Sequence, residues 1–490
     1  MAERKGTISY RDFSGGLIED RLAAAATTNS PKAFAPNEFP TFSNLTLRDR
    51  GRLTTRGGFV QLVASGAIGS LICPVPGGDA AIVTPAASKV VRFNSGTAAF
   101  ADLLTTFTAN CLHYFNGNVY AGSAAALQRI PIATWTPAAI TGAPAAVLHM
   151  TDIGDRLYCA IGSTRKIQVS GLLTDSDWTS LDAGTIYLPD TSVNGYLLGG
   201  CRLGTRYLAF TPGGIWLCAW APGGYACERV TSEATISASQ RHTPVECVLA
   251  GLGLCVVFIS AEGEVCAVTA GGQLVKPLTS RLTPATTASL QATWLEGQGL
   301  YLWVDTTKGG IYALHTAVKG FPVSKWTLGT GTPGAVARQV LAGRDRLLCS
   351  TAGGALLSHL DAHDEAPDFV RDDSLAGAFY QVQGKIRTRP EDAGSRDMKA
   401  WRRAVITGRV STGVASPTVL LRQYLSDATD DYSDLTVTLS DRIEELLVGV
   451  REFTSLELSL STSAASAVAA QQHLVEVGEI RLDFGKGPAR

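Results

Sequence analysis

The feature that most limits how this chain can fold is a pair of short apolar strands that recurs seven times. In each repeat a turn rich in glycine or asparagine leads into one apolar run, and a turn of small residues leads into a second. Self-similarity at a fixed spacing is typical of repeat architectures. The first runs are DAAIVTP, NVYAGS, RLYCAI, RYLAF, LCVVFIS, GLYLWV and RLLCST, and their partners are KVVRF, ALQRI, KIQVS, GIWLC, EVCAV, GIYAL and ALLSH.

The spacing of these pairs matches the size of a β-propeller blade. Equivalent positions follow one another at about 44 residues on average, within the ~40–50 residues of known propeller blades. They are Ile82, Tyr120, Tyr158, Leu208, Val257, Tyr301 and Leu348. An apolar run such as CLHYF precedes most pairs, and a looser one such as TIYLPD follows most, which gives four strands per repeat. The sequence therefore predicts an all-β fold with a seven-bladed propeller over residues 58–365; unrelated hairpins in a β-sandwich are the alternative.

The seventh repeat lacks a fourth strand of its own before the polar stretch SHLDAHDEAPD. The apolar run GFVQLVAS, from Gly58 to Ser65, precedes the first repeat and has the pattern of a strand. We expect it to occupy the missing place, because a closed ring of blades leaves only short, protected strand edges. The 51 glycines and the low share of charged residues, 17%, agree with a turn-rich protein that has a large core.

The segments on either side of the repeat have a different pattern. Residues 1–57 are polar and turn-rich, and we expect an arm that is ordered only when it docks on another surface. An acidic linker, Asp361–Asp373, follows the propeller. Residues 366–490 contain alternating runs such as YQVQGKIRT and SLELSLS, which predict strands with one buried face. We expect a C-terminal β-sandwich platform that receives the arm; the stretch DRIEELLVGV fits a short helix or another strand.

Charge and cysteine usage limit the possible partners and the compartment. The net charge of −1 argues against tight binding of nucleic acid, whose affinity depends largely on neutralising phosphates, but allows DNA to slide past. Ten cysteines are scattered singly, without a CxxC pair, mostly in apolar runs, which favours buried free thiols in a reducing compartment. The start lacks the apolar core of a signal peptide, and no run reaches the ~18 apolar residues of a membrane span. We expect the protein to be made and assembled in a cytoplasm.

Four common enzyme motifs are missing from the sequence. There is no GxSxG elbow, no GxxxxGK[ST] phosphate loop, no HExxH and no GxGxxG that opens a helix. A glycosidase needs two opposed carboxylates, and no convincing pair is visible. We therefore predict that the chain is not an enzyme and has no catalytic, cofactor-binding or metal-binding residues. An enzyme acting on glycans, a lyase or glycosidase, and a propeller that binds a host surface or another protein are the alternatives.

Three weak metal-site or motif matches have simpler explanations. His359, His363 and Asp364 have ligand chemistry, but a solvated linker explains them as well. The acidic stretch SDATDDYSD lacks the glycine and the distal glutamate of a calcium loop and reads as a strand-connecting turn. Asp175, Asp177 and Trp178 resemble an Asp-box turn without its glycine, and we expect them to end a blade.

The clearest basic concentration in the chain lies near the start of the C-terminal region. Its arginines, which lie around a tryptophan, form either the outer face of a strand pair or a contact between subunits, because Arg and Trp are enriched at interface centres. The acidic linker on a neighbouring copy offers complementary charge. The candidate interface residues are Arg387, Arg389, Trp401, Arg402, Arg403, Asp368, Asp372 and Asp373.

Short motifs at both ends of the chain resemble one family of phage structural proteins. The N-terminal motif consists of Phe13–Leu17, Phe39, Asn44–Leu45 and Arg50–Gly58. The C-terminal motif consists of Lys399–Arg403 and Glu479–Phe484. This organisation is similar to that of the tail nozzle, tail tubular protein B and packaged-DNA stabilisation proteins of short-tailed phages, in which such a start precedes a propeller.

The resemblance implies a structural role in a virion tail. It predicts a ring, usually of six copies, at the distal end of the tail, held by an adaptor ring and in contact with other tail proteins such as fibres. The ring would form the last part of the channel, retain packaged DNA and later let it slide out without sequence-specific binding. A near-neutral chain suits such passage better than a basic one.

Overall fold

The structure is a computed structural model of the chain. It describes residues 59–359, apart from positions 67–68, 85–86, 176, 181, 191–194, 280–281, 283–290, 329–330 and 342. Before and after this range it describes the backbone of individual strands. Within the described part, the only helices are two short 3-10 turns, η4 (Ala238–Gln240) and η5 (Glu296–Gln298), and no helix is long and apolar enough to cross a membrane.

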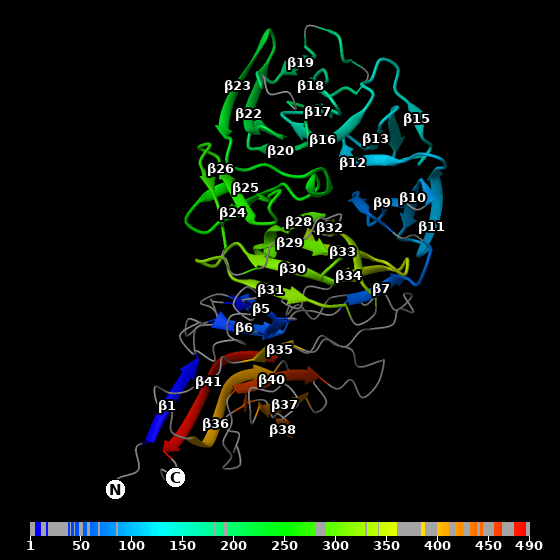
Figure 1. The fold of residues 1–490 in the computed structure, drawn as a ribbon. Helices are drawn as coiled ribbons and strands as arrows, with labels where there is room; N and C mark the ends of the chain where they lie inside the picture. Colours follow the sequence, from blue (N-terminus) through cyan, green and yellow to red (C-terminus); the bar gives the residue numbers. More distant parts are fainter. Residues whose placement is uncertain are drawn as a thin grey trace.

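Seven blades of four antiparallel strands form the propeller, as the repeat predicts (Figure 1). Six of them are separate four-stranded sheets, and blade 6 is one end of a larger sheet. Blade 1 consists of β8 (Leu71–Pro74), β9 (Ala80–Thr84), β10 (Lys89–Asn94) and β11 (Ala99–Leu104). Blade 2 consists of β12 (Ala109–Phe115), β13 (Asn118–Ser123), β14 (Leu127–Pro131) and β15 (Ala138–Ala139). Blade 3 consists of β16 (Val147–Ile153), β17 (Arg156–Ile161), β18 (Lys166–Val169) and β19 (Gly184–Tyr187). Blade 4 consists of β20 (Gly199–Leu203), β21 (Arg206–Thr211), β22 (Gly214–Ala221) and β23 (Gly224–Thr231). Blade 5 consists of β24 (Val245–Leu249), β25 (Gly253–Ile259), β26 (Val265–Thr269) and β27 (Leu274–Val275). Blade 6 consists of β28 (Ala292–Leu295), β29 (Leu300–Asp305), β30 (Gly310–His315) and β31 (Val323–Trp326).

Blade 7 combines the end of the repeat with a strand from its start. Its strands are β32 (Pro333–Leu341), β33 (Arg344–Thr351), β34 (Leu356–His359) and β7 (Phe59–Val63). Strand β7 pairs antiparallel with β34, and Phe59 lies opposite His359. The prediction that the GFVQLVAS run closes the ring is confirmed.

The first strand of each blade lies innermost and contacts the first strand of the next blade all around the ring. Strand β32 contacts β8, which completes the circle. Side chains between neighbouring blades form the core: the rings of Phe210 and Phe258 meet edge-on at 5.1 Å between blades 4 and 5. The rings of Tyr158 and Tyr207 stack at 5.9 Å between blades 3 and 4. The second strands are buried on both faces, because each blade packs between two others.

The terminal strands form two further arrangements beside the propeller (Figure 1). One is a sheet of β39 (Arg442–Ile443), β36 (Lys399–Val410), β41 (Val475–Lys486), β6 (Arg52–Thr55) and β5 (Leu45–Arg48), with β1 (Lys5–Tyr10) also paired to β41. The other continues blade 6 beyond β31 through β4 (Thr41–Ser43), β35 (Gly384–Arg387), β40 (Ser455–Thr462), β37 (Pro417–Tyr424) and β38 (Tyr432–Thr438). A separate parallel pair joins β2 (Gly16–Leu17) and β3 (Glu38–Phe39).

These sheets show that the ends of the chain contain strands, as the alternating pattern indicates. Their packing into a β-sandwich platform stays a prediction, as do the domain boundaries at residues 57 and 365. In the stretch that fits a helix or a strand, Arg442–Ile443 is a strand and the remainder lies outside the described residues.

Candidate functional site

The two faces of the propeller differ in what they carry. The turns between strands 1 and 2 and between strands 3 and 4 of every blade lie on one face, which we call the turn face. The turns between strands 2 and 3, and the connections from one blade to the next, lie on the other face, which we call the connection face. The innermost strands run between the two faces, so their side chains are candidates for a site in the central channel.

Charged side chains on innermost strands link blades 2 to 5 near the turn face. His113 Nε2 lies 3.0 Å from Asp152 Oδ1, and Arg202 lies 3.8 Å from the other oxygen of Asp152. Arg202 Nε donates to Glu246 Oε2 at 2.7 Å, and Gly204 N donates to Glu246 Oε1 at 2.9 Å. The hydrogen bond from His113 is the main cause that holds the pKa of Asp152 below its ordinary value. Asp152 and Glu246 thus each have polar partners on a neighbouring blade, and Arg202 lies between the two carboxylates.

A second set of polar contacts joins blades 5, 6 and 7 on the same face. Arg338 Nε donates to Asp345 Oδ1 at 2.7 Å, and its Nη2 donates to Glu296 Oε2 at 3.0 Å. The backbone N–H of Ala250 in blade 5 donates to Thr316 O in blade 6 at 2.8 Å. These contacts lie in turns, where backbone groups not used in a sheet need partners.

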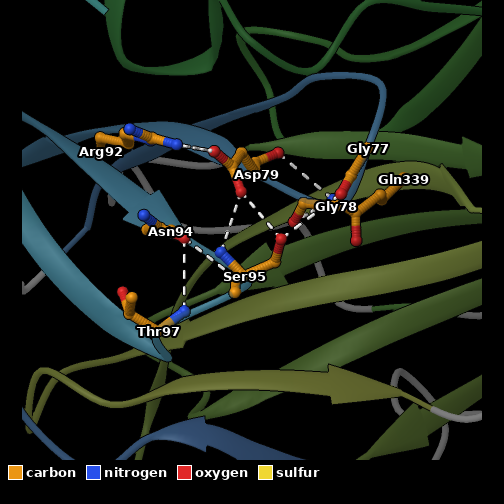
Figure 2. Close-up of polar contacts among 9 residues, drawn as sticks. Gly77, Gly78, Asp79, Arg92, Asn94, Ser95, Thr97 and Gln339 are labelled. Atoms are coloured by element: carbon orange, nitrogen blue, oxygen red, sulfur yellow. Dashed lines mark hydrogen bonds and ion pairs between the residues drawn. The ribbon is translucent and has the colours of Figure 1, made fainter.

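The joint where the ring closes is also on the turn face (Figure 2). Gln339 of blade 7 is 3% exposed and donates to Gly78 O at 2.9 Å in blade 1. The neighbouring Asp79 accepts from Arg92 at 2.6 Å, and from the N–H and O–H of Ser95 at 2.9 and 2.8 Å. Burial disfavours the charged form of Asp79, but these donors outweigh it and hold its pKa below the ordinary value. Both carboxylate oxygens of Asp79 and the carbonyl oxygen of Gly78 have donors within the joint, so we assign it a structural role.

The connection face carries a cluster of different character at the end of the channel. His149 lies near the start of β16, and Arg241 and His242 lie in the connection between β23 and β24. Burial is the largest cause that lowers the pKa of both His149 and His242 to about 3, and the charge of Arg241 adds to the effect. No sequence pattern indicates this cluster, because His149 lies about 90 residues before the adjacent Arg241 and His242 and the three share no motif.

The predicted interface residues fall partly on described strands. Arg387 pairs with Glu457 in the register of β35 and β40, and Trp401 and Arg403 pair with Phe484 and Asp483 in β36 and β41. Arg402 lies at the irregularity of that register. The other candidates, Arg389, Asp368, Asp372 and Asp373, lie outside the described residues. The charged interface therefore stays a prediction.

The weak matches have structural explanations where the structure describes them. His359 is 2% exposed and its ring stacks on Trp326 at 5.1 Å, so it belongs to the propeller core and the expectation of a solvated linker is wrong for it. Its sequence neighbours His363 and Asp364, and the acidic stretch at 427–434 apart from three strand residues, lie outside the described part. Within that part no group of three potential ligands is present.

The Asp175 segment lies inside a blade rather than at its end. It forms the connection between β18 and β19 of blade 3, the third and fourth strands. Asp175 is buried and accepts from Tyr120 Oη at 2.9 Å and from Arg129, while Trp178 Nε1 donates to its backbone carbonyl at 2.7 Å. The expectation that these residues end a blade is wrong, because the chain makes a long turn before the fourth strand.

The cysteines are mostly buried, as their apolar surroundings predict, but two pairs are close in space. Nine of the ten are buried and Cys227 is partly exposed. Cys218 lies directly opposite Cys227 on β22 and β23, with a sulfur–sulfur distance of 3.1 Å. Cys247 lies opposite Cys255 on β24 and β25. Single cysteines in the sequence thus become cross-strand neighbours in the fold.

Comparison with known proteins adds no assignment to the propeller that the structure itself shows. No family model matches the chain, and no curated protein does. Virginiamycin B lyase from Staphylococcus aureus is 13% identical, covering 60% of this chain and 94% of its own, with a TM-score of 0.44. Kuenenia stuttgartiensis hydrazine synthase is 11% identical, covering 60% of this chain and 95% of its own, with a TM-score of 0.44. The extracellular domain of the putative hybrid two component system BT4673 from B. thetaiotaomicron is 14% identical, covering 77% of this chain and 47% of its own, with a TM-score of 0.45. These identities transfer no activity, because propellers serve many functions.

Proposed function

We propose that the chain is a structural subunit of the tail of a short-tailed phage, of the nozzle type. Several copies, six by resemblance, would form a closed ring at the distal end of the tail, held by an adaptor ring. The ring would retain packaged DNA and guide it out at infection. The near-neutral charge supports passage of DNA without gripping.

The observation that carries this proposal is the meeting of the two terminal motifs in one sheet. Residues Arg52–Thr55 of the N-terminal motif form β6, which pairs with β41. The C-terminal motif Glu479–Phe484 lies within β41, whose other neighbour is β36 with Trp401. Parts of both motifs thus lie in one sheet, which supports a common role for them, whereas Gly16–Leu17 and Phe39 of the N-terminal motif lie in the separate pair of β2 and β3.

The way the propeller is attached supports a structural role as well. Strand β4 pairs with β31 of blade 6 on one side and with β35 on the other. A hydrogen-bonded sheet therefore continues from the propeller into the C-terminal strands. Such continuity holds two parts in a fixed relative orientation, which a building block of a ring needs.

The mass of the full-length chain under native conditions tests the proposal. We expect discrete closed rings, because ring formation needs two different patches that meet on neighbouring copies. Reversing charge with Arg402→Glu and Arg403→Glu is expected to weaken the rings, whereas Arg206→Glu and Arg229→Glu on the propeller serve as the matched control. A wild-type chain that stays monomeric with the adaptor present would contradict the proposal; rings that survive the Arg402/Arg403 reversal would refute the charged contact alone.

A protein-interaction propeller is the second candidate, and exposed apolar side chains on the turn face favour it. Val248 and Val340 lie on innermost strands and are each 50% exposed, and Leu252 lies in the turn after β24. Exposed apolar groups around one face are typical of a docking surface. Replacing Val248 and Val340 by Ser separates the two candidates: an interaction propeller would lose its partner, whereas a nozzle subunit would still form rings.

A glycan-cleaving enzyme gains no such support. Two described pairs of neighbouring carboxylates each share a cation: Glu262 and Glu264 flank Lys276, and Glu296 and Asp345 flank Arg338. Shared cations of this kind are typical of structural ion pairs. That the chain is not an enzyme stays a prediction.

A further inference from the structure

Two cysteines of blade 4 face each other across its outer pair of strands. Cys218 lies in β22 and Cys227 lies in β23, and the two residues are directly opposite in the antiparallel register. Opposite residues in such a pair have Cα atoms about 4.5–5.5 Å apart. A disulfide joins residues whose Cα atoms are about 4.4–6.8 Å apart. The backbone of blade 4 therefore holds these two cysteines at a separation that a disulfide accepts.

The side chains of this pair point toward one another. The two Sγ atoms of Cys218 and Cys227 lie 3.1 Å apart in a hydrogen-bonded contact. A sulfur–sulfur bond is about 2.05 Å long, so the atoms need to approach by only about 1 Å. Both side chains lie in the core between blades 3 and 4, in the cluster that contains Ile167 and Ile186 of blade 3. A small rotation of the side chains brings the sulfurs to bonding distance and leaves the strand register unchanged.

The two sulfurs differ in their access to solvent. Cys218 is 0% exposed, whereas Cys227 is partly exposed on the outer strand. The contact with Cys218 lowers the pKa of the Cys227 thiol, and the same contact together with burial raises the pKa of Cys218. The thiolate is the form that attacks an oxidant. Cys227 is therefore the cysteine that meets a reagent first, and Cys218 is placed to react second.

A second pair in blade 5 has the same register without the access. Cys247 lies opposite Cys255 on β24 and β25, and both residues are 0% exposed. Burial raises the pKa of both thiols, that of Cys255 to about 11. An oxidant from solution meets neither sulfur while the propeller is folded. This pair serves as an internal control for the pair in blade 4.

We propose that Cys218 and Cys227 form a disulfide when the folded protein meets a small disulfide oxidant such as oxidised glutathione. The Cys227 thiolate attacks one sulfur of the oxidant, whose sulfur–sulfur bond breaks, and the first glutathione leaves and takes up a proton. Cys218 then loses its proton, attacks Cys227 Sγ and displaces the second glutathione. The two cysteines lose two electrons, and one glutathione disulfide is reduced to two thiols.

The disulfide fastens the outer strand of the blade to its neighbour. Strand β23 is the last strand in the order of its sheet, and most of its residues are exposed. Edge strands of this kind are the parts of a sheet most open to unwanted pairing with other chains. The pair stays reduced in a cytoplasm and becomes oxidised in oxidising surroundings. This chemistry needs only the folded blade and occurs whether or not the chain assembles into a ring.

Mass spectrometry of the full-length protein after incubation with oxidised glutathione at about pH 8 tests the proposal. Free thiols are blocked with N-ethylmaleimide before digestion with trypsin. Cys218 and Cys227 share the tryptic peptide of residues 207–229, so their disulfide appears as the loss of two hydrogen atoms from one unlabelled peptide. Cys247 and Cys255 share the peptide that follows Arg241. We expect at least about tenfold more disulfide in the first peptide than in the second.

Single variants separate the two steps of the reaction. In Cys218→Ala the second step is lost, so glutathione should stay attached to Cys227. In Cys227→Ser the buried Cys218 should remain a free thiol. Cys73→Ala, which changes a buried cysteine of blade 1, is the matched control and should form the disulfide as the wild type does. Circular dichroism shows whether each variant is folded.

The wild-type result decides the proposal even if a variant does not fold. A native protein whose Cys227 remains a thiol, or carries glutathione without passing it to a disulfide with Cys218, overturns it. Oxidation of Cys247 and Cys255 at the same rate as Cys218 and Cys227 overturns it as well, because the selectivity would then not come from access in the folded blade.

Discussion

Blades 1 to 5 and blades 6 and 7 are built in different ways. Each of the first five blades takes its four strands from one continuous stretch of chain. Blade 7 takes its outer strand β7 from before the repeat, and blade 6 is extended by β4, which lies only 15 residues earlier. One short N-terminal stretch, residues 41–63, thus both closes the propeller and attaches it to the C-terminal strands. Closure of the ring and attachment of the C-terminal strands therefore both depend on strand pairs whose members are far apart in the sequence.

The largest expected effect comes from weakening the borrowed strand of blade 7. Phe59 is 2% exposed and packs with Leu357 and Trp326 in the core between blades 6 and 7. Replacing a buried Phe by Ala leaves a cavity, so Phe59→Ala should lower the free energy of unfolding by about 3–5 kcal/mol. Urea unfolding measures the change. Val340→Ala, at a half-exposed position, should change it by less than about 1 kcal/mol, and equal effects would contradict the closing role of β7.

The next prediction separates attachment from closure. Strand β4 has hydrogen-bonded neighbours on both sides, where a proline cannot donate to the ladder. Phe42→Pro should therefore abolish hydrogen-exchange protection in β35 and β40 while the protection of blades 1 to 5 persists. Ala138→Pro, in the exposed edge strand β15 of blade 2, is the control and should leave β35 and β40 protected. Simultaneous loss of protection in the propeller would show that β4 is also needed for closure.

The sequence predicts those parts of the fold whose contacts lie within one repeat, and misses contacts between distant segments. The apolar runs around Ile82 and Tyr120 can be recognised as blade strands from the sequence alone, because the second strand of every blade is a buried apolar run. The missing strand in the seventh repeat even indicated β7. The pairing of β4 with β31 had no signal, since three residues carry no period. Arg241 and His149 were equally invisible, because sequence patterns say little about which loops meet in a channel.

A smaller effect is expected at the joint between blades 7 and 1. Gln339 is buried and donates to Gly78 O, so Gln339→Ala leaves that carbonyl without its partner. Such a loss typically costs about 1–3 kcal/mol. Chemical unfolding should show this decrease for Gln339→Ala and almost none for Gln273→Ala, which changes an exposed glutamine of blade 5. If both variants have wild-type stability, the joint contributes little beyond β7.

The smallest effect concerns local opening within a blade made of one continuous stretch. Cys227 is partly exposed, and its hydrogen-bonded contact with Cys218 lowers the pKa of its thiol. Burial raises the pKa of Cys73 to about 12 and that of Cys201 likewise. A thiol reagent added to the native protein at about pH 8 should therefore label Cys227 first. Mass spectrometry identifies the site, and labelling of many cysteines at one rate would show that the contiguous blades open readily.

The central proposal is that the propeller is rigidly attached to the terminal strands and that these strands would build the ring. Electron cryo-microscopy of the full-length chain with its adaptor tests it most directly. The account predicts closed rings of one copy number in which every propeller has the same orientation, with β4 continuing blade 6 into the ring body. Single subunits, or rings whose propellers take variable orientations, would contradict it.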